Sequence, residues 1–419
     1  MEIWHILAIS SRAQAVPDVR VYNVKMHKIE TRLPRNIIIV AFVALASGFG
    51  QDLVSSVLPG YLVLIGLSHA SIGLIDGLLQ GVTALFRFVS GVLSDKFKNR
   101  KSLVFLGYAL SSVARPLLAL TGAFWSVATL RVIDGVGKGT KDAPRDALVA
   151  DSAPAHASGR AFGFHRFIDT AGSVLGPLAA AGLLFALTPS LGTYRFIFAL
   201  AAIPGAVALG LIFFGVREPE ALKRASKSNG TSLPWRFWVF TAGMAIVWLS
   251  KINDSLFLIR AGDIGIPLAW IPVLFASFTL LYAVSSYPIG IWSDRVGKWP
   301  FITAGWFLLS AIEFGFAHGP SLLPALGLFA GYGLFYALTE GSGRAYIADL
   351  VPPEQRGSAY AIFYTVIGLA AIIGGFALGH IWDAQSPHDA FQLASYGTLI
   401  GALLLFTIRK TSPGLVKNR

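Results

Sequence analysis

The sequence predicts an all-α integral membrane protein with twelve transmembrane helices in two pseudo-symmetric six-helix bundles. Apolar segments of about 20 residues recur through the chain, charged residues are scarce, and two motifs repeat half a chain apart. A helix needs about 20 apolar residues to cross the ~30 Å hydrocarbon layer, and it satisfies its own backbone groups. The predicted spans are 36–66, 71–93, 102–123, 125–150, 159–187, 193–215, 236–260, 268–292, 299–317, 321–347, 357–380 and 390–408.

The composition excludes an ordinary soluble domain. Only 13% of the residues are charged and the mean hydropathy is +0.64, whereas about a quarter of a soluble chain is charged. The net charge of +12 comes from basic residues gathered in alternate loops, such as Lys96–Lys101 and Arg217–Lys227, while the loops between contain no Lys or Arg. This asymmetry predicts a multi-pass protein of the inner membrane with both termini in the cytoplasm. The basic residues are not interleaved with aromatic ones, which argues against nucleic-acid binding.

The polar segments divide the chain. We expect a cytoplasmic, disordered N-terminal segment over 1–34, a first bundle over 35–216 and a cytoplasmic linker over 217–235. A second bundle over 236–410 and a tail over 411–419 follow, and either Met1 or Met26 is the natural start.

Two motifs support an internal duplication. The segment Gly91-Val-Leu-Ser-Asp95-Lys recurs as Gly290-Ile-Trp-Ser-Asp294-Arg, at an offset of 294 − 95 = 199 residues. Ala150-Asp151 recurs as Ala348-Asp349, at an offset of 349 − 151 = 198 residues. Repeats of this kind place a substrate site between the halves, near the middle of the bilayer.

These residues resemble the major facilitator superfamily of secondary transporters over about residues 35–410. The loop signature of that family, Gly-x-Leu-Ala-Asp-Arg-x-Gly-Arg-Arg/Lys, corresponds to Gly91–Lys101 and, more closely, to Gly290–Lys298. Its fourth-helix pattern, Arg-x-x-Gln-Gly-x-Gly, appears as Arg131–Gly137 with Asp134 in place of Gln. The fifth-helix antiporter pattern appears as Gly163, Gly172 and Gly176-Pro177, with Ala180-Ala181 in place of the final Gly pair. The segment Gly137–Leu148, GKGTKDAPRDAL, resembles a bacterial permease subgroup.

The fourth predicted helix carries an unusual number of charges, and each would cost roughly 2.5–3.5 kcal/mol if it faced lipid near the helix centre. Residues 134, 138, 141, 142 and 145 follow the three- and four-residue steps of one helix face. We therefore expect a polar wall of a cavity. Internal neutralisation, of Asp134 by Lys138 and of Lys141 by Asp142, is the alternative. The candidate substrate-binding residues are Arg131, Lys138, Lys141, Asp142, Arg166, Asp169, Lys251 and Arg344.

The candidate proton carriers are acidic residues and a His within the predicted spans. Asp52 lies about 15 residues into the first span, near mid-membrane at 1.5 Å per residue, and it is the leading candidate. His165 is considered because the unperturbed pKa of His is about 6.5. The full set of candidates is Asp52, Asp134, His165, Asp254 and Glu340. Arg87 and Arg115 either join these networks or extend their charges to the interface.

The resemblance also implies gating residues, namely Asp95, Arg100, Asp151, Asp294 and Arg295. It implies that Asp95 meets the start of a helix near Gly357 and that Asp294 meets one near Gly159, where a helix N-terminus favours a carboxylate. Arg100 is expected to pair with Asp151.

Secondary active transport is therefore the leading function, as proton-coupled export of a small organic solute. Proton-coupled uptake of an organic anion or zwitterion, and a non-transporting sensor with a transporter-like body, are the alternatives. No enzyme is expected, since the eight His are scattered and no nucleophile–base pair or metal cluster is recognisable. We expect no cofactor and no metal; the expected partners are a small-molecule substrate, protons and lipid, and the protein is expected to be a monomer.

Overall fold

The computed structural model describes residues 33–97, 99–153, 158–218, 232–352 and 355–408, and these residues form helices and no strands. The N-terminal helices are α1 (Arg35–Ser55), α2 (Leu58–Leu64), α3 (His69–Phe97), α4 (Arg100–Leu117), α5 (Phe124–Ser152), α6 (Ser158–Ala186), α7 (Leu191–Leu200) and α8 (Ala202–Gly215). The C-terminal helices are α9 (Trp235–Ser250), α10 (Asp254–Asp263), α11 (Ile271–Val296), α12 (Lys298–Ala317), α13 (Leu322–Leu350), α14 (Arg356–Ala384) and α15 (Pro387–Ile408). Short 3₁₀ helices cover Leu118–Leu120 and Leu268–Trp270. Almost all of the predicted N-terminal segment, most of the linker and the whole tail lie outside the described residues.

Each of the twelve predicted spans coincides with one long helix or with two consecutive ones, which confirms the all-α membrane fold. Ten segments of the described residues are long and apolar enough to cross a membrane. The predicted spans 125–150 and 321–347, which became α5 and α13, are not among them. Both helices are 29 residues long but carry charged side chains within their length. Their membrane position therefore rests on the neighbours that enclose them.

Three predicted spans are each broken into two helices. The first is interrupted between α1 and α2, just before Pro59, and the sixth at Ala201, shortly before Pro204. Proline lacks the N–H that a continuous helix requires. The seventh is interrupted at Lys251–Asn253, where the Asn253 side chain accepts a hydrogen bond from the Leu256 N–H (3.2 Å) and caps α10.

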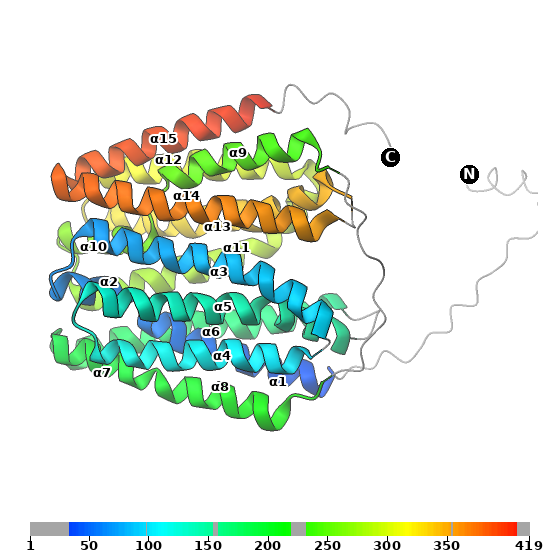
Figure 1. Cartoon of the computed structure of the whole chain (residues 1–419). Coiled ribbons are helices and arrows are strands. Elements are labelled where there is room, and N and C mark those ends of the chain that lie inside the picture. Colours follow the sequence, from blue (N-terminus) through cyan, green and yellow to red (C-terminus); the bar gives the residue numbers. More distant parts are fainter. Residues whose placement is uncertain (1–32, 98, 154–157, 219–231, 353–354, 409–419) are drawn as a thin grey trace, which may run out of the picture. The chain divides into compact units, whose positions relative to one another are not determined.

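From Pro34 on, the described chain forms one compact unit. Within it most helix contacts fall among α1–α8, the N-terminal set, and among α9–α15, the C-terminal set, although α3 and α14 pack most extensively on each other. The two sets meet through α3 on α14, α6 on α11, and α2 and α3 on α10, and the first of these pairs crosses the middle of Figure 1. The division of the chain into separate bundles over 35–216 and 236–410 remains a prediction.

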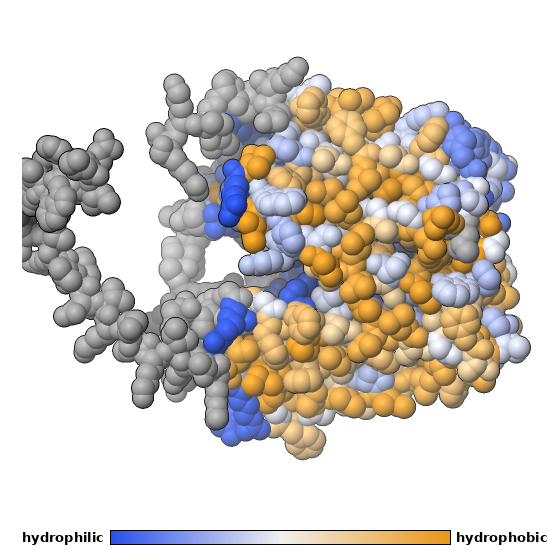
Figure 2. Space-filling model, turned by 180° about the vertical axis from the view of Figure 1, so that it is seen from behind, coloured by the Kyte–Doolittle hydropathy of each residue, from blue (hydrophilic) through white to orange (hydrophobic). Residues whose placement is uncertain are grey.

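The helices end in two groups. The Arg35 end is where α1 and α9 begin and α8 and α15 end, and the His69 end is where α2 and α10 end and α3 and α11 begin. Between the ends, large apolar side chains such as Phe42, Leu106 and Phe213 are exposed. Figure 2 shows the resulting apolar belt over the middle of one face, with hydrophilic residues toward both ends. Such a surface is suited to lipid rather than to water.

Small residues allow α3 and α14 to approach closely near the His69 end. A Cβ added at Gly77 would lie 2.6 Å from the Ile372 Cα and 2.9 Å from the Ala371 oxygen. Gly73 faces Gly375, and Gly379 faces the backbone of His69, in the same way. Small residues at helix crossings are a common packing device in membranes because they bring backbones into contact.

This contact gives a prediction of stability. Gly77→Leu must separate α3 from α14, and overpacking of this kind costs typically about 1–3 kcal/mol. We expect a lower apparent melting temperature for the purified protein, measured by scanning fluorimetry in detergent. The matched control is Gly182→Leu, since a Cβ at Gly182 of α6 meets nothing within 4 Å. Equal melting temperatures for the two variants would contradict the packing argument.

Candidate functional site

Two adjoining cavities lie between the N-terminal and C-terminal sets, from the middle of the unit toward the Arg35 end. The first has a volume of about 300 Å³ and is lined chiefly by α3, α9, α13 and α14. The second has a volume of about 340 Å³ and is lined chiefly by α1, α5 and α6. Five residues line both: Arg87, Lys138, Glu340, Arg344 and Tyr364. The volumes suit a small molecule.

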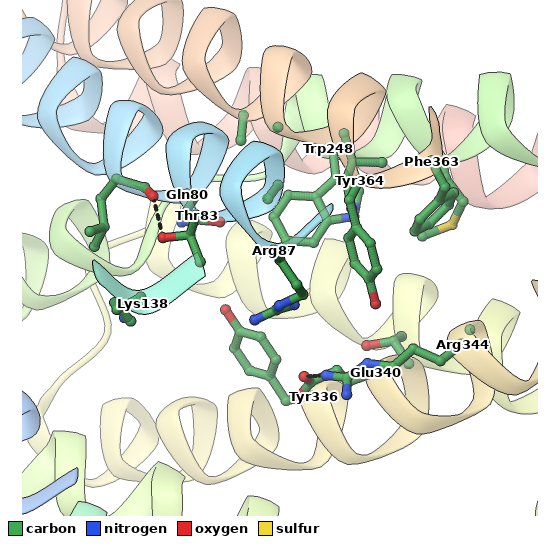
Figure 3. Close-up of a pocket in the computed structure, with 18 of the residues that line it drawn as sticks. Gln80, Thr83, Arg87, Lys138, Trp248, Tyr336, Glu340, Arg344, Phe363 and Tyr364 are labelled. Carbon is green, nitrogen blue, oxygen red and sulfur yellow. Dashed lines mark hydrogen bonds and ion pairs between the residues drawn. The ribbon is translucent and has the colours of Figure 1, made fainter. Parts of the chain in front are cut away.

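The first cavity, called here the aromatic cavity, is mostly apolar. Its walls include Trp248, Trp306, Phe335, Tyr336 and Phe363. Figure 3 shows that aromatic rings from α9, α13 and α14 surround a space into which charged groups of α3 and α13 also point. The aromatic cavity therefore offers ring faces beside polar groups at one edge.

The second cavity, called here the charged cavity, is lined by the ionic face of α5. Asp142 pairs with Arg87 of α3 (2.5 Å) and with Arg145 (3.7 Å), and Arg145 also pairs with Asp146 (3.1 Å). Lys141 also interacts with Asp142 electrostatically but forms no direct ion pair with it among the described residues, so the alternative that the two neutralise each other stays a prediction. The guanidinium groups of Arg87 and Arg145 are the direct ion-pair partners of the Asp142 carboxylate.

Asp134 lies deeper on α5 and is buried between two arginines. Arg115 of α4 lies 3.0 Å from its carboxylate and Arg131 lies 3.5 Å from it. Arg115 also donates to the Ser47 carbonyl (3.2 Å) and to the Gln51 side chain (3.3 Å) of α1. Arg115 therefore joins the ionic network. Lys138 interacts with Asp134 electrostatically but forms no direct ion pair with it among the described residues, so its part in neutralising Asp134 stays a prediction. The proton role of Asp134 stays a prediction.

Two lysines of α5 form no direct ion pair among the described residues, although carboxylates lie within electrostatic reach of both. Lys141 is buried, donates to the Ser47 hydroxyl (3.1 Å) and lies 4.3 Å from the centre of the Tyr108 ring. Lys138 is half-buried and lines both cavities, and no hydrogen bond or ion pair involves its ammonium group within the described chain.

Asp52 of α1 is buried just behind the charged cavity. It accepts a hydrogen bond from its neighbour Gln51 (3.1 Å), and Gln51 itself lines the cavity. Ser173 and Lys138 are among the other polar groups near its carboxylate. In the described residues Asp52 makes no ion pair, unlike Asp134. It remains the leading candidate for a proton carrier.

The candidates on α6 are divided between the cavity and the packed interior. Arg166 and Asp169 line the charged cavity and pair with each other (3.6 Å). Arg166 also donates to the Tyr282 hydroxyl of α11 (2.8 Å), which links the two sets. His165 is buried outside both linings, and its Nε2 has no hydrogen-bond partner in the described chain.

In the C-terminal set, the candidates lie in two places. Glu340 and Arg344 line both cavities, pair with each other, and Glu340 accepts a hydrogen bond from Tyr282. Lys251 and Asp254 lie at the break between α9 and α10, outside both linings, and pair at 3.1 Å. The hydroxyls of Tyr332 and Tyr336 donate to Asp254, the latter at 3.0 Å. Arg131 in the N-terminal set also lies outside the linings.

Two buried acids were missed in the sequence. Asp76 of α3 pairs with Arg131 (3.6 Å) and accepts a hydrogen bond from the Ser255 N–H of α10 (3.2 Å). Glu313 of α12 is fully buried and accepts a hydrogen bond from the Ile252 N–H (3.0 Å). The sequence signal that could have identified them is a single acidic residue within an apolar span, because such a residue needs a partner in the membrane. Both acids accept hydrogen bonds at the interruption between α9 and α10, where backbone N–H groups lack helical partners.

The two sets are joined at the His69 end. Asn253 donates to the Gly73 carbonyl (3.2 Å), and His69 lies 2.7 Å from Asp383 of α14. Together with the Asp76–Ser255 bond, these contacts close the cavities on that side.

The predicted gating residues lie toward the Arg35 end. Arg100 forms the expected ion pair with Asp151. Asp294 and Arg295 are exposed, while the side chain of Asp95 and the surroundings of Gly159 and Gly357 lie outside the described residues. The gating role of all five residues stays a prediction.

Comparison with known proteins identifies the family. A family model described as Major Facilitator Superfamily matches residues 40–259 and 239–419. The chain is 31% identical over 396 residues to an uncharacterized MFS-type transporter, MJ1317, of Methanocaldococcus jannaschii, covering 92% of this chain and 97% of the relative. It is 25% identical over 350 residues to the multidrug resistance protein MdtH of Photorhabdus laumondii, covering 82% and 85%.

The fold agrees with this assignment. The crystal structure of a mutant form of the nucleoside transporter NupG superposes with a TM-score of 0.77 at 14% identity, covering 89% of this chain and 99% of the other. At that identity the likeness concerns the fold alone. A helical membrane unit with a family model matched along most of its length leads to one conclusion: the chain belongs to the Major Facilitator Superfamily of multi-pass membrane transporters.

Proposed function

We propose that this protein is a secondary active transporter that moves a small organic solute by alternating access through the two cavities. The observation that carries the proposal is a charged and aromatic space between two helix sets that are joined at the His69 end. Transporters of this kind bind the solute between repeats and rock one repeat against the other. With the Arg35 end in the cytoplasm, as the loop charges predict, the described state faces inward.

We propose protons as the coupling ion and export as the direction. Asp52 supports proton coupling because it is a buried carboxylate without an ion-pair partner in the described chain, beside the cavity. Export is supported by the antiporter pattern on α6 and by the relative named as a multidrug resistance protein. Gly172 and Gly176 of that pattern meet the backbone of α1 at Leu45 and Phe49, so the pattern sits where α6 contacts the helix that carries Asp52.

One observation favours a second candidate, proton-coupled uptake of an organic anion. Lys138 places a basic group without a direct ion pair, among the described residues, in the wall of both cavities. The two candidates share the site and differ in the sign of the coupling between proton and solute. A non-transporting sensor would keep the same cavity but would move no solute.

Proteoliposomes separate these functions. The purified protein is reconstituted, a pH gradient is imposed in either direction, and flux of radiolabelled organic acids, amines and neutral solutes is measured. We expect protein-dependent accumulation of at least one solute that a protonophore abolishes. Accumulation on the acidic side supports export by exchange for protons, and accumulation on the alkaline side supports uptake with protons. Absence of flux for every solute class would contradict transport.

Asp52 provides a test of the coupling step. Asp52→Asn keeps the size and the hydrogen bond from Gln51 but cannot exchange a proton. We expect it to abolish accumulation driven by the pH gradient while solute counterflow, which needs no net proton movement, continues. The control is Asp263→Asn, an exposed residue at the end of α10 outside both linings. If gradient-driven accumulation survives Asp52→Asn, Asp52 is not the coupling group.

A further inference from the structure

We propose that the two cavities form one binding site for an amphiphilic organic anion, whose acidic group pairs with Lys138 and whose aromatic or alicyclic body occupies the aromatic cavity. This inference rests on the proposed function and names the substrate class of the same site. Three features of the lining support it: its charge balance, the surroundings of its two lysines, and its aromatic wall.

The lining has more basic than acidic groups. Six basic residues and four acidic ones face the two cavities. All four acids are already engaged: Asp142 with Arg87 and Arg145, Asp146 with Arg145, Asp169 with Arg166, and Glu340 with Arg344. Within the described residues, the basic groups of the lining that form no direct ion pair are therefore Lys138 and Lys141.

Of these two lysines, only Lys138 is available to a solute. The ammonium group of Lys141 is buried against the Ser47 hydroxyl and the face of Tyr108. That of Lys138 lies where the cavities meet and makes no hydrogen bond or direct ion pair among the described residues, although Asp134 and Asp52 lie within electrostatic reach behind it. A desolvated ammonium without a hydrogen-bond acceptor is costly, and an incoming carboxylate, sulfonate or phosphate would supply a direct one.

The remainder of the solute faces a different chemistry. From Lys138 the space continues between Trp248, Phe363 and Tyr364 on one side and Tyr336 on the other, as Figure 3 shows. A fully polar body would find partners only at polar positions of the lining such as Gln80 and Thr83, and its remaining hydroxyls would lie unpaired against these rings. A cationic body would meet Lys138 and Arg87. An apolar ring system attached to an anionic group satisfies both walls at once.

The probes for this site are 2-naphthoate, its neutral isostere 2-naphthamide, and acetate, which keeps the charge without the body. Binding to the purified full chain in nanodiscs is measured by calorimetry at neutral pH with no gradient. We expect naphthoate to bind at least about tenfold more tightly than either analogue. Lys138→Gln should weaken naphthoate about tenfold and leave naphthamide unchanged, while Lys138→Arg restores the preference for the acid.

The control is Lys101→Gln, which removes the same charge from a residue whose ammonium donates to the Phe213 carbonyl outside the linings. It should behave as the wild type, and the melting temperatures of Lys138→Gln and Lys138→Arg should agree if both are folded. The proposal is overturned if naphthoate does not bind in the millimolar range, if naphthamide binds equally well, or if Lys138→Gln keeps the preference. If another solute shows proton-driven flux but naphthoate does not bind, only this substrate class is overturned. If naphthoate binds but no solute shows flux, the transport function is overturned and the binding site stands.

Discussion

The cost of charge in a membrane-spanning helix is the constraint on which this structure depends. α5 carries Arg131, Asp134, Lys138, Lys141, Asp142 and Arg145, and each charge must meet a partner or a water-accessible cavity because lipid cannot solvate it. The helix is therefore surrounded by α1, α3, α4 and α6, which supply partners such as Arg87 and Arg115. Close approach permits this enclosure: a Cβ on Gly107 of α4 would lie 2.7 Å from the Gly137 oxygen of α5. Packing and ion pairing thus depend on the same helix.

The same helix connects the cavity to the closure at the His69 end. Arg131 bridges Asp134 and Asp76, and Asp76 in turn accepts the Ser255 N–H at the start of α10. That N–H is free for a partner in the other set because the seventh span is broken at Lys251–Asn253. Lys138 lies one helical turn from Asp134 on α5. A solute at Lys138 is therefore close to the ionic chain whose far end holds the two sets together, which provides a physical route for coupling between occupancy and closure.

The sequence predicted the twelve spans, the repeat and the charged face of α5, because hydropathy, spacing and motif are local properties. It did not predict the helix breaks at Ser56–Val57, Ala201 and Lys251–Asn253, because the apolar segments on the two sides of each break fall within one continuous predicted span. Neighbours on the same helix were offered as ion-pair partners, so Lys138 was considered for Asp134, whereas Arg115 of another helix lies against it. Asp76 and Glu313 were missed because a lone acid in an apolar span gains meaning only from its partner, and those partners, the Ser255 and Ile252 N–H groups, lie far along the chain.

Alternating access requires that one cavity is reached from each side of the membrane in turn. The chain contains no cysteine, so a single Thr83→Cys in the wall of the aromatic cavity reports without background. Its labelling by a membrane-impermeant maleimide is measured from either face of oriented vesicles, at rest and during turnover. Alternating access predicts reaction from the face at the Arg35 end at rest, and from the opposite face as well once the transporter is cycling. Labelling from one face alone under cycling conditions, or from neither, would contradict it.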